Sequence, residues 1–221
     1  MDGLIERWAT PIVRRVERQS DDLAHTALRE LILAHEEPER RKGDSPQPLH
    51  KNVFESEFDF LNWRDPSVLA LKQLMHRRLA DVILATSTVD QAALMKFKIV
   101  CESWFHVTRS GGYVRSHNHP QHSWSAIYCV DPGDPEPAYD HDAGHLLFFD
   151  PRTSAGMFLD MANAELKPAY GCHAYRFRPS IGELIIFPSY VWHAVEPYHG
   201  ERPRITVAAN FRFNLPAQPP A

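Results

Sequence analysis

The sequence predicts an α+β fold, in which N-terminal helices brace a double-stranded β-helix, that is, a jelly-roll barrel of the cupin-like kind. Apolar residues recur at helical spacing in the first part of the chain and at strand spacing from Phe97 onward. Pro, Gly and Asp turns separate the later apolar segments, as in barrels of many short strands. We expect a single domain over residues 1–221, because a chain of 221 residues can bury one substantial core.

The part of the chain from residue 1 to residue 90 is expected to be mainly helical. An opening strand is predicted at residues 8–16, interrupted by a proline, and a first helix at residues 20–35, where acidic residues follow a capping serine. The polar stretch 36–51 contains several prolines and a glycine, which predicts a loop. Two interpretations of this stretch remain open, a surface loop and a lid over a site.

The second helix is predicted over residues 65–85. Asp65 can cap it, and Pro66 suits the first helical position, where an N–H group has no partner in the helix. The apolar residues that follow form one stripe on the helix surface, which we interpret as packing on the back of a sheet. They are Val68, Leu71, Met75, Leu79 and Val82.

The jelly-roll core is expected over residues 95–214. Apolar and polar residues alternate from Phe97 to Thr108, which is strand spacing, and Gly111-Gly112 predicts a hairpin turn. Further short strands are predicted at residues 113–116, 125–130, 145–149, 172–177, 183–187 and 204–213.

Composition excludes several classes of protein. The formal net charge is −4 with both signs scattered, so no basic stripe indicates nucleic acid and no polybasic tract indicates a membrane surface. No apolar run approaches the roughly 18 residues of a membrane span, and the polar start is unlike a signal peptide. The three widely spaced cysteines argue against a disulfide framework and favour a reducing, cytoplasmic location. No sequence feature fixes the oligomeric state.

Three histidines are spaced as metal ligands. His117 and His119 share a face if the backbone there is extended, because residues two apart in a strand point the same way. His193 follows another apolar strand and a Pro-Ser turn. A His-x-His pair in isolation is more often a pair of loop histidines than a ligand set. Together with His193, and with Arg204 beyond it, the pattern favours a mononuclear metal site.

Arg204 begins a strand whose two faces separate cleanly. One face is apolar, whereas Arg204 lies on the small, polar face. A buried guanidinium requires an anionic partner and matches a carboxylate with two parallel hydrogen bonds. Two partners remain open, a bound anionic co-substrate and one of the 28 acidic residues.

Two segments of the chain resemble a known family. Residues 112–120 (GYVRSHNHP) with 124–130 (WSAIYCV), and residues 182–193 (GELIIFPSYVWH) with 204–211 (RITVAANF), are similar to the two ligand motifs of the 2-oxoglutarate-Fe(II) oxygenases, a His-x-His variant within the non-haem iron dioxygenase superfamily. The resemblance implies a jelly-roll dioxygenase. Such an enzyme would hydroxylate a substrate that the sequence does not identify and release succinate and CO2.

The resemblance also implies the site residues. Fe(II) would be held by His117, His119 and His193, with 2-oxoglutarate as co-substrate anchored by Arg204, and dioxygen as the second co-substrate. His119 stands where the broader superfamily has an acid, so a carboxylate from elsewhere is an alternative ligand; the candidates are Asp131, Asp140 and Asp142. Apart from the resemblance, strand position makes three further residues candidates to contact the co-substrate: Ser125, Tyr128 and Asn210. For Ser125 and Tyr128 the alternative of ordinary strand residues stays open.

Two other functions are consistent with a jelly roll. A cupin-like metalloprotein would use the three histidines without 2-oxoglutarate, but the glutamate expected after His-x-His is missing and Arg204 then has no assigned task. A non-catalytic binding protein would leave the histidines incidental and bind no stoichiometric metal. Uptake of iron and then of 2-oxoglutarate discriminates among the three functions.

Overall fold

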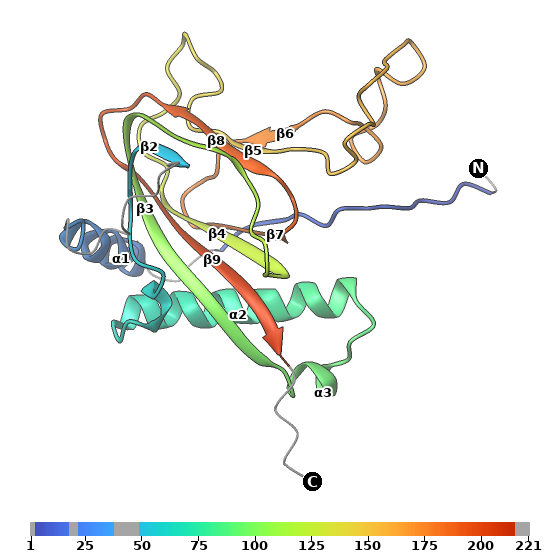
Figure 1. Ribbon diagram of the computed structural model, residues 1–221. Coiled ribbons are helices and arrows are strands. Elements are labelled where there is room, and N and C mark those ends of the chain that lie inside the picture. Colours follow the sequence, from blue (N-terminus) through green and yellow to red (C-terminus); the bar gives the residue numbers. More distant parts are fainter. Residues whose placement is uncertain (1–2, 18–21, 38–48, 215–221) are drawn as a thin grey trace.

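The computed structural model describes residues 3–17, 22–37 and 49–214 (Figure 1). Its strands form one antiparallel sheet in the order β1-β7-β4-β9-β3-β8-β5-β6, with β2 beside β3. The sheet curves into a half-barrel, which confirms the predicted jelly-roll class. The strands are β1 Val13–Val16, β2 His50–Glu55, β3 Lys98–His117, β4 Trp124–Asp131, β5 Leu146–Phe148, β6 Tyr175–Phe177, β7 Glu183–Pro188, β8 His193–Tyr198 and β9 Arg204–Asn214. The helices are α1 Asp22–Ala34, the 3-10 helix η2 Phe60–Asn62, α2 Pro66–Thr86 and α3 Gln91–Leu94.

Helices α1 and α2 cover the outer face of the sheet, as predicted (Figure 1). Helix α2 begins where the sequence indicates, because the Asp65 side chain accepts a hydrogen bond from the Ser67 backbone N–H at 2.8 Å. Its apolar stripe is buried against outward-facing side chains of the strands, among them Phe105, Val207 and Phe211. The opposite face of the sheet holds a second, smaller core that includes Phe148 and Phe187.

The opening strand is shorter than predicted. Only Val13–Val16 pairs with β7, whereas residues 8–12 are not in a strand. Pro11 lacks the N–H group that a ladder needs, and Trp8 has a φ of +63°, which is incompatible with a strand. The chain before β1 therefore runs outward from the sheet, as Figure 1 shows.

The hairpin predicted at Gly111-Gly112 is wrong. Strand β3 continues through both glycines, pairing with β9 over its first part and with β8 from Gly112 to His117. Gly111 has a φ of +75°, and a Cβ on Gly112 would lie 2.7 Å from the Asn52 backbone oxygen of β2. The glycines therefore bend one long strand from the first half of the sheet into the second.

Two strands, β2 and β8, were not predicted from the sequence. β2 begins at the end of the stretch expected to be a loop, and its mainly polar sequence, with Lys51 and Asn52 exposed, is typical of an edge. β8 starts at a histidine and contains a proline, so it lacks a strand pattern. Residues 38–48, on which the choice between loop and lid depends, lie outside the described residues. The division into a helical part and a jelly-roll core within one domain stays a prediction.

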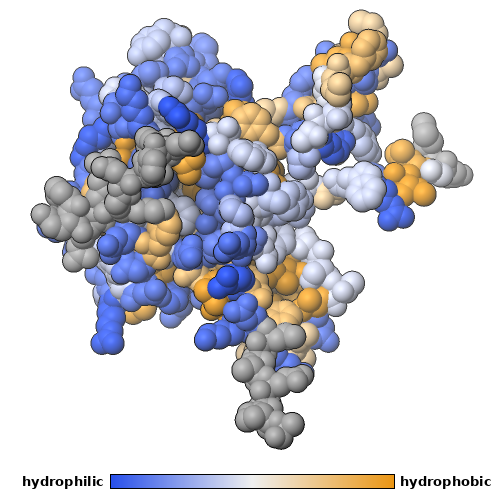
Figure 2. All heavy atoms as spheres, viewed as in Figure 1, coloured by the Kyte–Doolittle hydropathy of each residue, from blue (hydrophilic) through white to orange (hydrophobic). Residues whose placement is uncertain are grey.

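The segment between β5 and β6, residues 149–174, projects from the sheet (Figure 1). It exposes apolar side chains, seen as orange spheres at the upper right of Figure 2, including Met157, Phe158 and Met161. No helix in the described part of the chain is long and apolar enough to cross a membrane.

Helix α2 offers a matched test of the fold. Leu71 is 1% exposed and Leu69 is 44% exposed on the same helix. We expect Leu71→Ala to lower the free energy of unfolding by about 2–5 kcal/mol, because it leaves a cavity in the core, and Leu69→Ala to change it by less than about 0.5 kcal/mol. Urea denaturation measures both; equal effects would contradict the packing described.

Candidate metal centre

Three imidazoles meet where β3 ends and β8 begins. His117 and His193 are direct partners in the β3–β8 pairing, and their ring centroids are 4.3 Å apart. His119 lies two residues beyond β3, with its ring centroid 5.0 Å from each of the other two. One nitrogen of each ring lies within 4.8 Å of the other two, and this is the metal-ligand cluster found among the described residues.

Backbone carbonyls orient two of the rings. His117 Nδ1 lies 2.8 Å from the Arg115 oxygen, and His193 Nδ1 lies 3.1 Å from the Val191 oxygen. A carbonyl only accepts, so each Nδ1 carries the hydrogen and each Nε2 keeps its lone pair for a metal. His119 is fixed through its backbone N–H, which donates to the Ser189 oxygen at 3.0 Å.

The environment keeps these imidazoles neutral. Burial, together with the neighbouring His117, lowers the pKa of His119 to about 3. Burial likewise lowers the pKa of His193 well below its usual value and also lowers that of His117. A neutral imidazole is the form that binds a metal. The donor set of three converging neutral nitrogens fits a divalent transition metal such as Fe(II).

The structure brings His119, and none of the three candidate carboxylates, to this cluster. Asp131 is buried away from it, with one oxygen 2.8 Å from Arg29 Nε and the other 3.0 Å from Arg202 Nη2. Asp140 lies 3.2 Å from His199, and Asp142 pairs with Arg176.

Arg204 lies on the wall of a narrow cavity beside the imidazoles. The cavity is lined by all three histidines and by the inward face of β9, and its volume is about 40 Å³. Arg204 is 3% exposed, and burial lowers the pKa of its guanidinium. No acid among the described residues is within ion-pair distance of Arg204. A buried cation facing a cavity without an anion fits a bound carboxylate.

A chain of hydroxyl groups borders the same cavity. Ser125 donates to Asn210 Oδ1 at 2.7 Å and accepts from Ser189 Oγ at 2.8 Å. Thr206 also lines the cavity between Arg204 and Asn210, and the sequence interpretation missed it although it shares their face.

The structure does not bring Tyr128 to the cavity. Its ring is fully buried on the outer side of the sheet, and its hydroxyl hydrogen-bonds His25 Nε2 of α1 at 3.0 Å. The expectation overlooked strand parity, because residues 125 and 128 are three apart on one strand and point to opposite faces.

The part of the sequence that contains the site matches the model of a known protein family. Residues 102–210 match the family described as "Putative 2OG-Fe(II) oxygenase". This part of the chain is a 2OG-Fe(II) oxygenase domain. These enzymes are oxidoreductases, with Fe(II) as the metal and 2-oxoglutarate as co-substrate. No curated protein sequence matches the chain.

Solved structures show the same fold as this oxygenase. A prolyl-4-hydroxylase from Pseudomonas putida is similar with a TM-score of 0.57 and 17% identity, over 91% of each chain. HygX from Streptomyces hygroscopicus, solved with nickel, 2-oxoglutarate and hygromycin B, has a TM-score of 0.55 and 13% identity, over 92% of this chain and 83% of that one. AviO1 from Streptomyces viridochromogenes has a TM-score of 0.55 and 15% identity, over 96% and 93%.

A second, wider cavity of the oxygenase opens from the imidazoles toward β2. Its volume is about 220 Å³, and it shares His117 and His119 with the narrow cavity. The sequence did not predict β2, which contributes His50 and Glu55 to the wall of this cavity. The wall residues that β2, β3 and the loops around them contribute include His50, Glu55, Phe58, Glu102, Trp104, His106 and His122.

Glu55 is an ionised carboxylate in this wall. Its two oxygens lie 2.8 Å from His106 Nε2 and 3.8 Å from His50 Nε2. Burial alone would raise its pKa, but the hydrogen bond with His106 and the nearby His50 imidazole outweigh burial and hold the pKa well below the usual range. Glu55 therefore keeps its negative charge at neutral pH.

Arg204 can be tested in the metal-free protein without ligands. We expect Arg204→Met to leave the free energy of unfolding unchanged or to raise it by about 1–4 kcal/mol, because it removes a buried charge that has no partner. Urea denaturation gives the value. The matched control is Arg14→Met, which leaves the buried Glu183 without its partner at 2.6 Å and should cost about 1–3 kcal/mol. A loss of 3–5 kcal/mol for Arg204→Met would show that the guanidinium is already paired.

Proposed function

We propose that this oxygenase hydroxylates its prime substrate while 2-oxoglutarate is converted to succinate and CO2. The observation that supports the proposal is the buried Arg204 guanidinium, which has no acidic partner among the described residues, in the same cavity as three neutral imidazoles. The guanidinium can bind a carboxylate, and the three imidazoles can bind a metal. A co-substrate that chelates a metal at one end and carries a carboxylate at the other end uses both. The cupin-like alternative leaves Arg204 without a task.

In this proposal His117, His119 and His193 would hold the iron, with His117 and His193 binding through Nε2. Three neutral ligands leave the metal charge uncompensated, so a dianionic co-substrate is attracted more strongly than it would be beside a protein carboxylate. When bound, Fe(II) and 2-oxoglutarate together supply the oxidising power that places one atom of dioxygen in a C–H bond of the substrate and the other in succinate.

The remaining residues position the co-substrate and exclude water. Arg204 binds the distal carboxylate of 2-oxoglutarate with two parallel hydrogen bonds. Ser125 and Asn210, held by Ser189, present polar groups along the same cavity. Phe187 and Leu146 also line it and keep the reacting centre dry.

We also infer a reducing compartment, the cytoplasm. Cys101, Cys129 and Cys172 are all free in the structure, which is typical of proteins that do not depend on disulfides.

The iron ligands are tested by metal content. We expect His193→Ala to lower the iron bound at equilibrium by at least tenfold, because two imidazoles remain. His173→Ala, which removes an exposed histidine outside the cluster, should bind one iron per chain like the unaltered protein. Elemental analysis after anaerobic dialysis against Fe(II) checks both, and full iron occupancy in His193→Ala would contradict the assignment.

The co-substrate site is tested by anaerobic titration of the Fe(II)-loaded protein with 2-oxoglutarate, following the visible metal-to-ligand charge-transfer band. We expect a saturable band, and an apparent affinity about 100-fold weaker in Arg204→Met, because a buried charged hydrogen-bonding pair is lost. Arg212→Met, an exposed arginine on the same strand, should titrate like the unaltered protein. Iron binding with no band would refute the use of 2-oxoglutarate.

A further inference from the structure

The two cavities that meet at the imidazoles carry opposite charges. The narrow cavity contains Arg204 and no acid, whereas the wide cavity contains Glu55 and Glu102 and neither lysine nor arginine. Both cavities border His117 and His119. The iron site therefore separates a side that attracts anions from a side that attracts cations.

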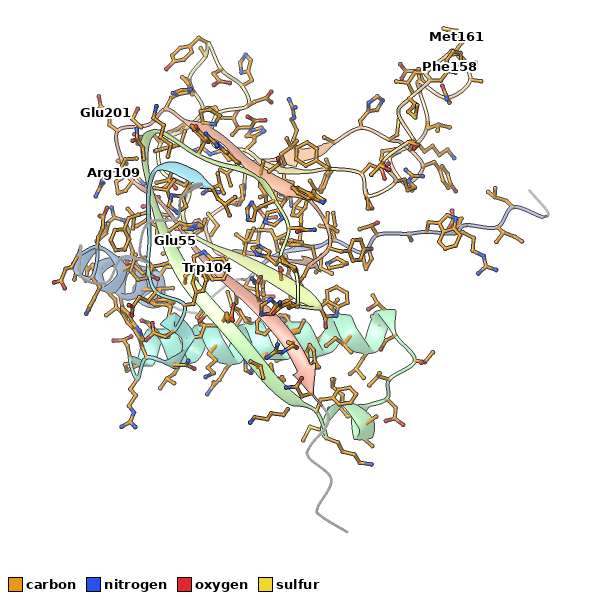
Figure 3. The ribbon with its side chains drawn as sticks, in the orientation of Figure 1. Glu55, Trp104, Arg109, Phe158, Met161 and Glu201 are labelled. Atoms are coloured by element: carbon orange, nitrogen blue, oxygen red, sulfur yellow. The ribbon has the colours of Figure 1, made fainter. Side chains whose placement is uncertain are left out.

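Aromatic rings complete the wide cavity. Phe58 and Trp104 both line it, and their ring centroids are 4.7 Å apart. An aromatic face attracts a cation within about 6 Å, most strongly for tryptophan. Trp104 and Glu55, from neighbouring strands, lie together on this side of the molecule (Figure 3). A carboxylate next to aromatic faces is a suitable environment for a protonated amine or a guanidinium.

Two polar side chains in the same wall can donate hydrogen bonds to a ligand. Asn210 is 4% exposed and lines both cavities; its Oδ1 accepts from Ser125, but its Nδ2 donates to no described residue. Trp104 is 5% exposed, and its Nε1–H points at His106 Nε2 at 3.1 Å.

The Trp104 N–H loses that acceptor when His106 Nε2 donates its hydrogen to Glu55. His106 Nε2 also lies 2.8 Å from Glu55 Oε2, and one ring nitrogen cannot donate and accept at once. When His106 donates to the ionised Glu55, the indole N–H has no acceptor among the described residues. It is then available, like the Asn210 amide, to an acceptor on a bound molecule.

We propose that the prime substrate binds in the wide cavity as a cation, with a protonated amine or guanidinium against Glu55 and Glu102 and a hydroxyl or carbonyl near the Trp104 and Asn210 N–H groups. This inference rests on the proposed function, because it places the substrate beside the iron ligands. Phosphate- or carboxylate-bearing substrates meet two like charges there.

The test uses three probes of equal length: 1,5-diaminopentane, 1,5-pentanediol and glutarate. The protein is loaded with Zn(II), which is redox-inert, and saturated with 2-oxoglutarate, and each probe is titrated by calorimetry at the same ionic strength. We expect the diamine to bind at least tenfold more tightly than the diol and glutarate to bind more weakly than either. Equal or tighter binding of the diol or glutarate would overturn the proposal.

Single charge removals locate the binding. Glu55→Gln should weaken diamine binding about tenfold and leave the diol unchanged. Glu102→Gln should weaken it about two- to threefold, because the Glu102 side chain is 49% exposed and screened by solvent. Glu201→Gln, the same change at an exposed residue away from the cavity (Figure 3), is the matched control and should have no effect. If Glu55→Gln does not fold, Glu102→Gln and the comparison of the three probes still test whether the cavity prefers a cation.

A further titration distinguishes the two sources of such a cation. Binding of the diamine but not of the blocked peptide acetyl-Gly-Lys-Gly-amide supports a free small amine, and binding of the peptide supports a lysine side chain; binding of neither overturns the proposal. Uptake of 2-oxoglutarate by the Zn(II)-loaded protein is measured first. If the Zn(II)-loaded protein does not take up 2-oxoglutarate, both the proposed function and this inference are wrong. If it takes up 2-oxoglutarate but shows no preference for the diamine, this inference alone is wrong.

Discussion

The pairing of β3 with β8 determines the candidate metal centre. It places His117 opposite His193, and the chain just past β3 then returns His119 to the same point through the backbone hydrogen bond to Ser189. A shift of one residue in this register would turn one imidazole to the other face of the sheet. The bend at Gly111, with its positive φ, allows β3 to reach β8 after pairing with β9.

The distribution of charge around the three imidazoles follows from the strand faces. β9 directs Arg204 and Asn210 inward and Val207 and Phe211 outward to the helices, so a cation is buried next to neutral metal ligands. β2 brings Glu55 to the other side. In the proposed arrangement the protein would supply no carboxylate to the metal, so the compensating negative charge would come from the dianionic co-substrate. The two acids line the other cavity.

Much of the fold and of the candidate site was predictable from sequence, and the wrong predictions have physical reasons. The predictions of helix α2 and of the two faces of β9 were correct, because long segments show a clear hydrophobic period and Asp65 is a clear helix cap. The hairpin at Gly111 was wrong, because a glycine pair permits a bend as readily as a reversal. Glu55 and His106 could not be assigned to a cavity, because β2 is a polar edge strand whose position depends on pairing distant in sequence. The position of Tyr128 could have been predicted from strand parity.

The most direct measurement is a crystal structure of the anaerobic complex with Fe(II) and 2-oxoglutarate. We predict iron bound by His117, His119 and His193, with no protein carboxylate as ligand, and the distal carboxylate of 2-oxoglutarate paired with Arg204. Iron held by an aspartate in place of His119, or 2-oxoglutarate bound away from Arg204, would contradict it.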